Sequence, residues 1–302
     1  MPLDPEAAAW LDRQRNEPMR SSLSVSEARA AYLRTSALTA DPAPLARVDD
    51  VMIAGQLRGR EYWPAADSAL PILVWLHGGR FFSGGIETHD ALCRALALAG
   101  QCRVLAVDYR LAPEHRFPAA VEDSLAAVEW AFSESPRVGV GGDSAGGNLA
   151  AVAALLHTRA KPAPLQCQLL VYPMMNLACS RPSHREFETG YGPGSADMRR
   201  GWREYLPEGH EGPLFINPRD ERVSPLFAEN LAGLPPAFVL TAEYDCLRDE
   251  GEDYARRLEQ EGVAVSQKRY DGAIHGFFQM PKVMRLGREA IDDAGAFLRS
   301  HL

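Results

Sequence analysis

The sequence predicts an α/β protein in which one mostly parallel sheet is covered on both faces by helices, and two observations support this. From about residue 70 onward, short apolar runs alternate with segments that read as helices, which is the rhythm of βαβ units. The runs are rich in branched residues, as expected for strands buried between helices. The predicted strands are residues 71–76, 102–107, 138–140, 167–172, 237–241 and 263–270. The predicted helices are residues 90–100, 119–132, 145–158, 250–261 and 285–302.

The first 63 residues precede this rhythm. Residues 1–45 read as helical segments, one opened by Pro5 and another over residues 25–38, before any strand begins. Residues 48–54 and 57–63 flank Gly55-Gln56 and predict an antiparallel hairpin at an edge of the sheet.

Residues 177–222 also depart from the rhythm, since they are rich in Arg, Gly, Pro and Glu around a short segment at 202–206. We expect N-terminal cap helices over residues 1–45 and a catalytic domain over 46–302, with a cap insertion around 177–222. Both cap parts are expected to fold over the carboxyl edge of the sheet, where open α/β sheets bind ligands. The alternative is a disordered N-terminal tail and a long surface loop.

Composition narrows the classes of function. With 302 residues, 46% of them hydrophobic, the chain can form one large α/β core with a small accessory part. A net charge of −8 without a long basic run disfavours nucleic acid and anionic membrane surfaces as partners. No apolar segment reaches the length of a signal peptide core or a membrane span, so we expect a soluble cytoplasmic protein. Five cysteines without a C-x-x-C pair predict reduced core thiols rather than disulfides or a zinc site.

The sequence GDSAGG at residues 142–147 contains the frame G-x-S-x-G, between a predicted strand and a predicted helix. Glycines on either side of Ser144 allow the sharp turn that exposes a nucleophilic hydroxyl. The alternatives are a structural turn and a phosphate-binding loop. Ser144 stands where the third glycine of G-x-G-x-x-G belongs, and no G-K-S or G-K-T follows, which disfavours phosphate binding.

A serine nucleophile needs a base and an orienting acid. Of eight histidines, we select His275, which follows the last predicted strand, over the weaker candidate His115. Asp245 ends the preceding strand and is the expected acid. The competing Asp249 lies where a helix begins and is interpreted as its cap. The order Ser144, Asp245, His275 is that of α/β-hydrolases.

The intermediate of acyl transfer also needs N–H donors for its oxyanion. Residues 76–82 directly follow a strand and contain Gly78 and Gly79. We assign the donors to the amides of Gly79, Arg80 and Ala145, and we expect Gly78 to shape the turn. A structural turn would use the same glycines, but this loop coincides with the serine motif and the ordered acid and base.

Through these motifs the sequence resembles the hormone-sensitive-lipase-like esterases, bacterial family IV of the α/β-hydrolase fold, in their G-D-S-A-G branch. The similar segments are HGG at 77–79, GDSAGGN at 142–148, VDYRLAPEHRFPAA at 107–120, SPL at 224–226, residues 245–251 and HGF at 275–277. The resemblance implies a carboxylesterase without cofactor or metal that acts on small ester substrates with short to medium acyl chains. It also implies a cap over the site. Members of the family often form a homodimer through the last sheet edge and a final helix, and residues 285–302 are compatible with this pairing without requiring it.

Two positions depart from the family pattern. Arg80 stands where a third glycine is usual, and Cys246 where proline is common. For Arg80 we considered two hypotheses: a guanidinium at the pocket mouth that favours acyl groups bearing a carboxylate, or a pair with a structural carboxylate. We interpret Cys246 as a packed thiol. The alternatives to an esterase are an amidase or lactonase with the same triad, or a non-catalytic member of the fold that binds small molecules.

Overall fold

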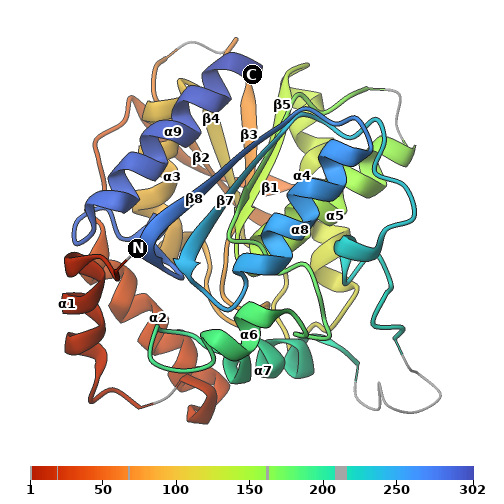
Figure 1. Ribbon diagram of the computed structural model, residues 1–302. Coiled ribbons are helices and arrows are strands. Elements are labelled where there is room, and N and C mark those ends of the chain that lie inside the picture. The colour runs from red at the N-terminus through yellow and green to blue at the C-terminus, as the bar shows by residue number, and fades with distance from the viewer. Residues whose placement is uncertain (1, 19, 67–68, 161–162, 208–215) are drawn as a thin grey trace.

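The computed structural model describes residues 2–18, 20–66, 69–160, 163–207 and 216–302. Within these ranges the chain builds an eight-stranded sheet with the order β1-β2-β4-β3-β5-β6-β7-β8 (Figure 1). The strands are β1 (Arg47–Ile53), β2 (Leu57–Trp63), β3 (Ile72–Leu76), β4 (Arg103–Val107), β5 (Val138–Asp143), β6 (Gln168–Val171), β7 (Ala237–Tyr244) and β8 (Val265–Ile274). The β1–β2 and β2–β4 pairs are antiparallel, and all other pairs are parallel. The predicted hairpin therefore lies at one edge and the mostly parallel sheet is confirmed.

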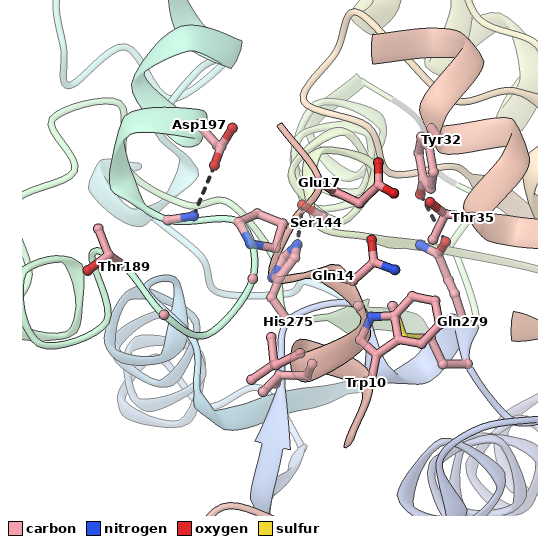
Figure 2. Close-up of a pocket in the computed structure, with 18 of the residues that line it drawn as sticks. Trp10, Gln14, Glu17, Tyr32, Thr35, Ser144, Thr189, Asp197, His275 and Gln279 are labelled. Carbon is pink, nitrogen blue, oxygen red and sulfur yellow. Dashed lines mark hydrogen bonds between the residues drawn. The ribbon is translucent and has the colours of Figure 1, made fainter. Parts of the chain in front are cut away.

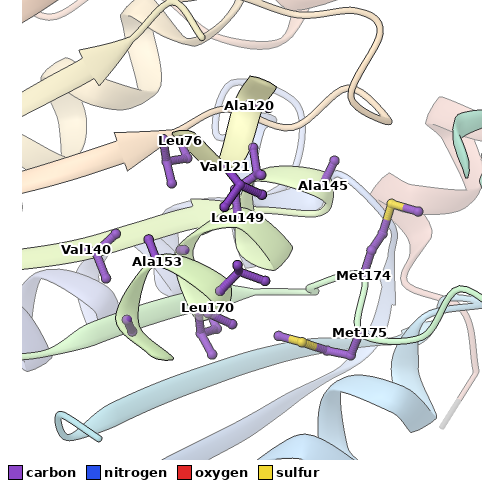
Figure 3. Packing of buried hydrophobic residues seen from close by; sticks show 14 of the residues in the cluster. Leu76, Ala120, Val121, Val140, Ala145, Leu149, Ala153, Leu170, Met174 and Met175 are labelled. Atoms are coloured by element: carbon purple, nitrogen blue, oxygen red, sulfur yellow. The ribbon is translucent and has the colours of Figure 1, made fainter. Parts of the chain in front are cut away.

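Helices cover both faces of this sheet (Figure 1). One face carries α3 (Ile86–Gly100) and α9 (Arg285–His301), and the other carries α4 (Ala119–Glu134), α5 (Ala145–Ala160) and α8 (Arg248–Gln260). All five residues of strand β3 are buried, so its side chains contribute to the hydrophobic core on both faces of the sheet. Ile72, Val74 and Leu76 pack into the cluster around α5, of which Figure 3 shows Leu76, whereas Leu73 and Trp75 face α3 and α9.

The remaining helices gather at one end of the sheet (Figure 1). They are α1 (Pro5–Gln14), α2 (Val25–Thr39), α6 (Pro182–Glu186) and α7 (Ser195–Tyr205), with short 3-10 turns at Arg20–Ser22, Pro225–Phe227 and Phe277–Gln279. The Asp4 carboxylate accepts hydrogen bonds from the first amides of α1, and Ser24 forms a capping box with Glu27 at α2. The helices expected in the first 45 residues are thus present. Residues 208–215 of the predicted cap insertion, including His210, lie outside the described residues.

Strand and helix ends differ from the sequence prediction where glycine or polar residues continue an element. Strand β5 runs to Asp143 rather than to residue 140, and β8 runs to Ile274 rather than to residue 270. The strands therefore extend further toward the carboxyl edge than their apolar runs. Among the described helices, none is long and apolar enough to span a bilayer.

Candidate active site

Ser144 stands on a sharp turn between β5 and α5. Its φ is +57°, in the left-handed region, and its backbone is held by the bonds Ser144 N to Val171 O (2.9 Å) and Met174 N to Ser144 O (3.0 Å). The turn needs glycine at 146, because a Cβ there would lie 1.9 Å from the carbonyl oxygen of Leu76. The close approach of β3 and the turn leaves the hydroxyl at the carboxyl edge of the sheet.

The three residues expected to act together are brought into contact at this edge. The Nε2 atom of His275 lies 3.1 Å from Ser144 Oγ (Figure 2), and its Nδ1 atom lies 2.7 Å from Asp245 Oδ2. Asp245 is buried, and its other oxygen accepts the Leu247 amide at 2.9 Å. This arrangement can deprotonate the serine hydroxyl while the carboxylate fixes the imidazole tautomer.

The competing candidates lie elsewhere. Asp249 accepts hydrogen bonds from the Ser183 amide (2.8 Å) and from Arg248 Nε (2.9 Å), so it joins α8 to α6. Its interpretation as the cap of α8 is wrong, because the helix already begins at Arg248 and the carboxylate turns toward α6. His115 is exposed in the loop between β4 and α4.

The loop after β3 lies against the serine turn. Gly79, Arg80 and Phe81 all have positive φ, at +133°, +57° and +65°. The Gly78 amide donates to Asp143 Oδ1 at 3.0 Å, so this amide holds the loop in place. Gly79 and Arg80 line the same cavity as Ser144 and His275. Ala145 begins α5, where the first amides of a helix have no intrahelical acceptor.

The structural role of Asp143 was not predicted from the sequence, where this residue is only a variant position of the serine motif. Its buried carboxylate accepts from Gly78 and from Gln279 Nε2, and contacts His89 Nε2 at 3.0 Å. Burial opposes ionisation, but the His89 charge and hydrogen bond and the Gly78 amide together lower the pKa of Asp143 below its ordinary value. The position directly before the serine was the one available signal.

Arg80 and Cys246, the two departures from the family pattern, are both buried. The Arg80 Nη1 atom lies 3.1 Å from Asp197 Oδ1, so the guanidinium is paired with a carboxylate of α7. The structure thus favours the pair with a structural carboxylate, and both members of this pair line the cavity. Cys246 Sγ lies 3.7 Å from the Pro193 carbonyl oxygen, and burial raises the pKa of this thiol. All five cysteines are free and buried, as expected of core thiols.

A cavity of about 680 Å³ lies above Ser144 and His275. Figure 2 shows the two side chains between Asp197 on one side and Trp10 and Tyr32 of the N-terminal helices on the other. The volume is within the range typical of small-molecule sites. In the part of the chain that the structure describes, no group of His, Cys, Asp or Glu side chains could hold a metal ion.

The chain is similar to known ester hydrolases in sequence and in fold. A family model described as alpha/beta hydrolase fold matches residues 73–279. The chain is 39% identical to the carboxylic ester hydrolase LipN of Mycobacterium tuberculosis, over 86% of this chain and 73% of that protein. It is 35% identical to an arylesterase of Saccharolobus solfataricus (94% and 95%) and 33% identical to an ethyl acetate hydrolase of Pseudomonas putida (100% of each). The structure of a hyperthermophilic esterase from Pyrobaculum calidifontis superposes with a TM-score of 0.92 at 38% identity, over 99% of both chains.

Proposed function

The chain belongs to the α/β-hydrolase fold family and is a carboxylic ester hydrolase of its hormone-sensitive-lipase-like group, and from this premise we propose that Ser144, Asp245 and His275 cleave short- to medium-chain acyl esters through an acyl-enzyme intermediate. One observation carries the proposal. The Ser144 hydroxyl, the His275 imidazole and the Asp245 carboxylate form one chain of contacts of 3.1 and 2.7 Å at the floor of the cavity.

The mechanism has two acyl-transfer steps. His275 Nε2 takes the Ser144 proton as Oγ attacks the ester carbonyl, and the imidazolium then protonates the leaving alcohol. Water repeats the sequence on the acyl-enzyme and releases the acid. The Asp245 carboxylate, held by the Leu247 amide, orients the imidazole and stabilises the imidazolium.

The developing oxyanion is assigned to the amides of Gly79, Arg80 and Ala145. Two sides of the site supply these donors: the loop after β3, and the N-terminus of α5 with its partial positive charge. Gly78 holds the loop through Asp143 and therefore acts on the site indirectly.

Helices at the cavity wall and the small ester named for one relative support the proposed preference for short to medium acyl chains. The cavity wall includes residues of α1, α2 and α7, which we propose to act as the cap predicted for residues 1–45 and 177–222. The named substrate of one relative, ethyl acetate, is a small ester. A cytoplasmic location and a homodimer through the β8 edge and α9 remain proposals, and sedimentation of the purified protein tests the dimer.

Hydrolysis of p-nitrophenyl esters from acetate to palmitate tests the function. Wild type and Ser300→Ala, a control at the exposed end of α9, should be most active on short chains, and Ser144→Ala should be inactive. A brief reaction with substrate, stopped in acid, should leave an acyl group on the peptide containing Ser144. Full activity of Ser144→Ala would refute the assignment, and a folded wild type without ester hydrolysis would direct the search to amides, lactones or binding.

A further inference from the structure

Three consecutive side chains of the loop after β3, at residues 80–82, pack against helix α7. Arg80 pairs with Asp197, and the Phe81 ring stacks on Tyr205 with centroids 4.0 Å apart. The guanidinium of Arg200 lies 4.9 Å above the Phe82 ring. Each contact joins a residue near position 80 to one far along the chain, so the loop and α7 form one packed unit.

Asp197 connects this unit to the start of α7. Its Oδ1 atom pairs with Arg80 Nη1 at 3.1 Å, and its Oδ2 atom accepts the Gly194 amide at 3.2 Å. Both side chains are nearly enclosed, with 7% of Arg80 and 12% of Asp197 exposed. Removing one member of such a pair leaves a buried charge without compensation, so the pair fixes the distance between loop and helix.

The helix approaches the loop closely enough to require a glycine. A Cβ at Gly201 would lie 2.8 Å from Arg80 Cβ and 3.2 Å from the Arg80 carbonyl oxygen. This contact involves the Arg80 backbone and the base of its side chain, in addition to the ion pair at the guanidinium. A shift of α7 would move the peptide units on either side of Arg80.

The loop conformation needs such support. Arg80 and Phe81 both carry side chains at positive φ, a conformation that L-residues with a Cβ avoid. A strained backbone persists only where its surroundings hold it. The Gly78 amide is held by Asp143, and the Arg80 side chain is held by Asp197 of α7.

We propose that Asp197 is a positioning residue for ester hydrolysis: through its ion pair with Arg80 it holds the Arg80 amide at the place where the oxyanion develops. This inference rests on the proposed function, because it assigns the Arg80 amide to the oxyanion. Asp197 also lines the cavity, and in this proposal it acts through Arg80 rather than on the ester. The pair also neutralises the guanidinium, so the site should select neutral acyl groups.

The test compares Asp197→Asn with Glu61→Gln. Asparagine keeps the shape and one acceptor while removing the charge. Glu61 pairs with Arg103 at 3.5 Å, with 7% of the Glu61 side chain exposed, and joins β2 to β4 outside the cavity. Its variant is therefore a control for the loss of a buried pair. For each protein we would measure the melting temperature, kcat and KM on p-nitrophenyl acetate, and the Ki of an aryl trifluoromethyl ketone. This ketone forms a tetrahedral oxyanion adduct with a serine.

Removing an oxyanion donor outright costs about 10²- to 10³-fold in kcat, so misplacing one should cost about tenfold. We expect Asp197→Asn to lower kcat about tenfold and raise the ketone Ki by the same factor, with KM unchanged. Glu61→Gln should stay within about twofold of wild type. Gly201→Ala, which displaces α7 and keeps both charges, should give the same kinetic signature as Asp197→Asn.

Three results would overturn the proposal: wild-type kcat and Ki in a folded Asp197→Asn protein, a rise in KM alone, or an equal loss in Glu61→Gln. The failure of the proposed function is distinguishable, because wild type and Glu61→Gln would then both lack ester hydrolysis. In that case the ketone adduct, observed by fluorine NMR, still compares the oxyanion sites of wild type and Asp197→Asn.

Discussion

Asp245→Asn should abolish catalysis by reversing the histidine tautomer, and the hydrogen bonds of Asp245 determine this outcome. Its Oδ1 atom accepts the Leu247 amide at 2.9 Å, while Oδ2 faces His275 Nδ1 at 2.7 Å. In the variant, the amide oxygen must stay with the Leu247 N–H, because an NH₂ group there would meet another donor. The NH₂ group therefore faces Nδ1 and forces it to accept. His275 then carries its proton on Nε2, which points at Ser144 Oγ and can no longer take the serine proton.

The wrong tautomer costs about 10⁴-fold in kcat in an enzyme with the same arrangement of groups, or about 5.4 kcal/mol at 1.36 kcal/mol per tenfold. We expect kcat on p-nitrophenyl acetate to fall by this factor in Asp245→Asn. The melting temperature should stay within a few degrees of the wild-type value. Asp249→Asn is the matched control, because its carboxylate contacts only Ser183 and Arg248 in the hydrogen bonds of the described residues. It should retain activity within about threefold. Near-wild-type kcat in Asp245→Asn, or a larger loss in Asp249→Asn, would refute the reasoning.

Three further predictions concern stability and reactivity. Burial lowers the pKa of His77 to about 3 and of His184 to about 4, from 6.5, so only the unfolded chain takes up these protons as the pH falls below 6.5. The free energy of unfolding should fall by up to about 1.4 kcal/mol per pH unit for each histidine, and urea titrations at pH 7 and 5 with no difference would contradict this. Gly146→Ala should lower the free energy of unfolding by about 3 kcal/mol, because its Cβ would meet Leu76 O at 1.9 Å; thermal unfolding at the wild-type temperature would show that the turn relaxes. The native protein should not react with a thiol reagent such as DTNB, whereas the protein in guanidinium should show five thiols, and a rapid native reaction would place a cysteine at the surface.

The sequence predicted the sheet and helices because their signals are local. The apolar runs and helical periods reflect burial between two layers, and the helices at α4, α5 and α9 begin at the predicted residues. Element ends were less accurate where glycine and polar residues continue a strand. In β5, Gly141 is paired with both β3 and β6, and a Cβ there would lie 3.1 Å from Leu169 Cβ. Close packing rather than apolar character keeps this residue in the sheet.

Helix α7 began earlier than its apolar segment indicated. The sequence indicated only a short segment at residues 202–206 within the cap insertion, whereas the helix starts at Ser195. Asp197 accepts the Gly194 amide and so stabilises the first turn. An acidic residue three positions after a glycine is a local signal for a helix start, and it could have been used.

Partners from distant segments could not be predicted. Ser144, Asp245 and His275 were found because each follows a strand that ends at the same edge, so topology brings them together. Asp143 also lies there, but its partners Gly78 and Gln279 are 65 and 136 residues away. No spacing in one sequence indicates such contacts.

The two buried carboxylates beside the oxyanion loop pose an electrostatic problem that their partners solve. A negative charge near a developing oxyanion raises its energy in a site that excludes water. The Asp143 carboxylate contacts the Gly78 amide, His89 and Gln279, and the Asp197 carboxylate is paired with the Arg80 guanidinium. Each carboxylate thus holds the loop while its field is cancelled by a donor or cation within hydrogen-bond distance. Arg80 thus has two roles: its amide is assigned to the oxyanion, and its guanidinium pairs with Asp197. An arginine in place of the usual glycine at position 80 therefore connects the loop to α7, and the pair adds no net charge to the site.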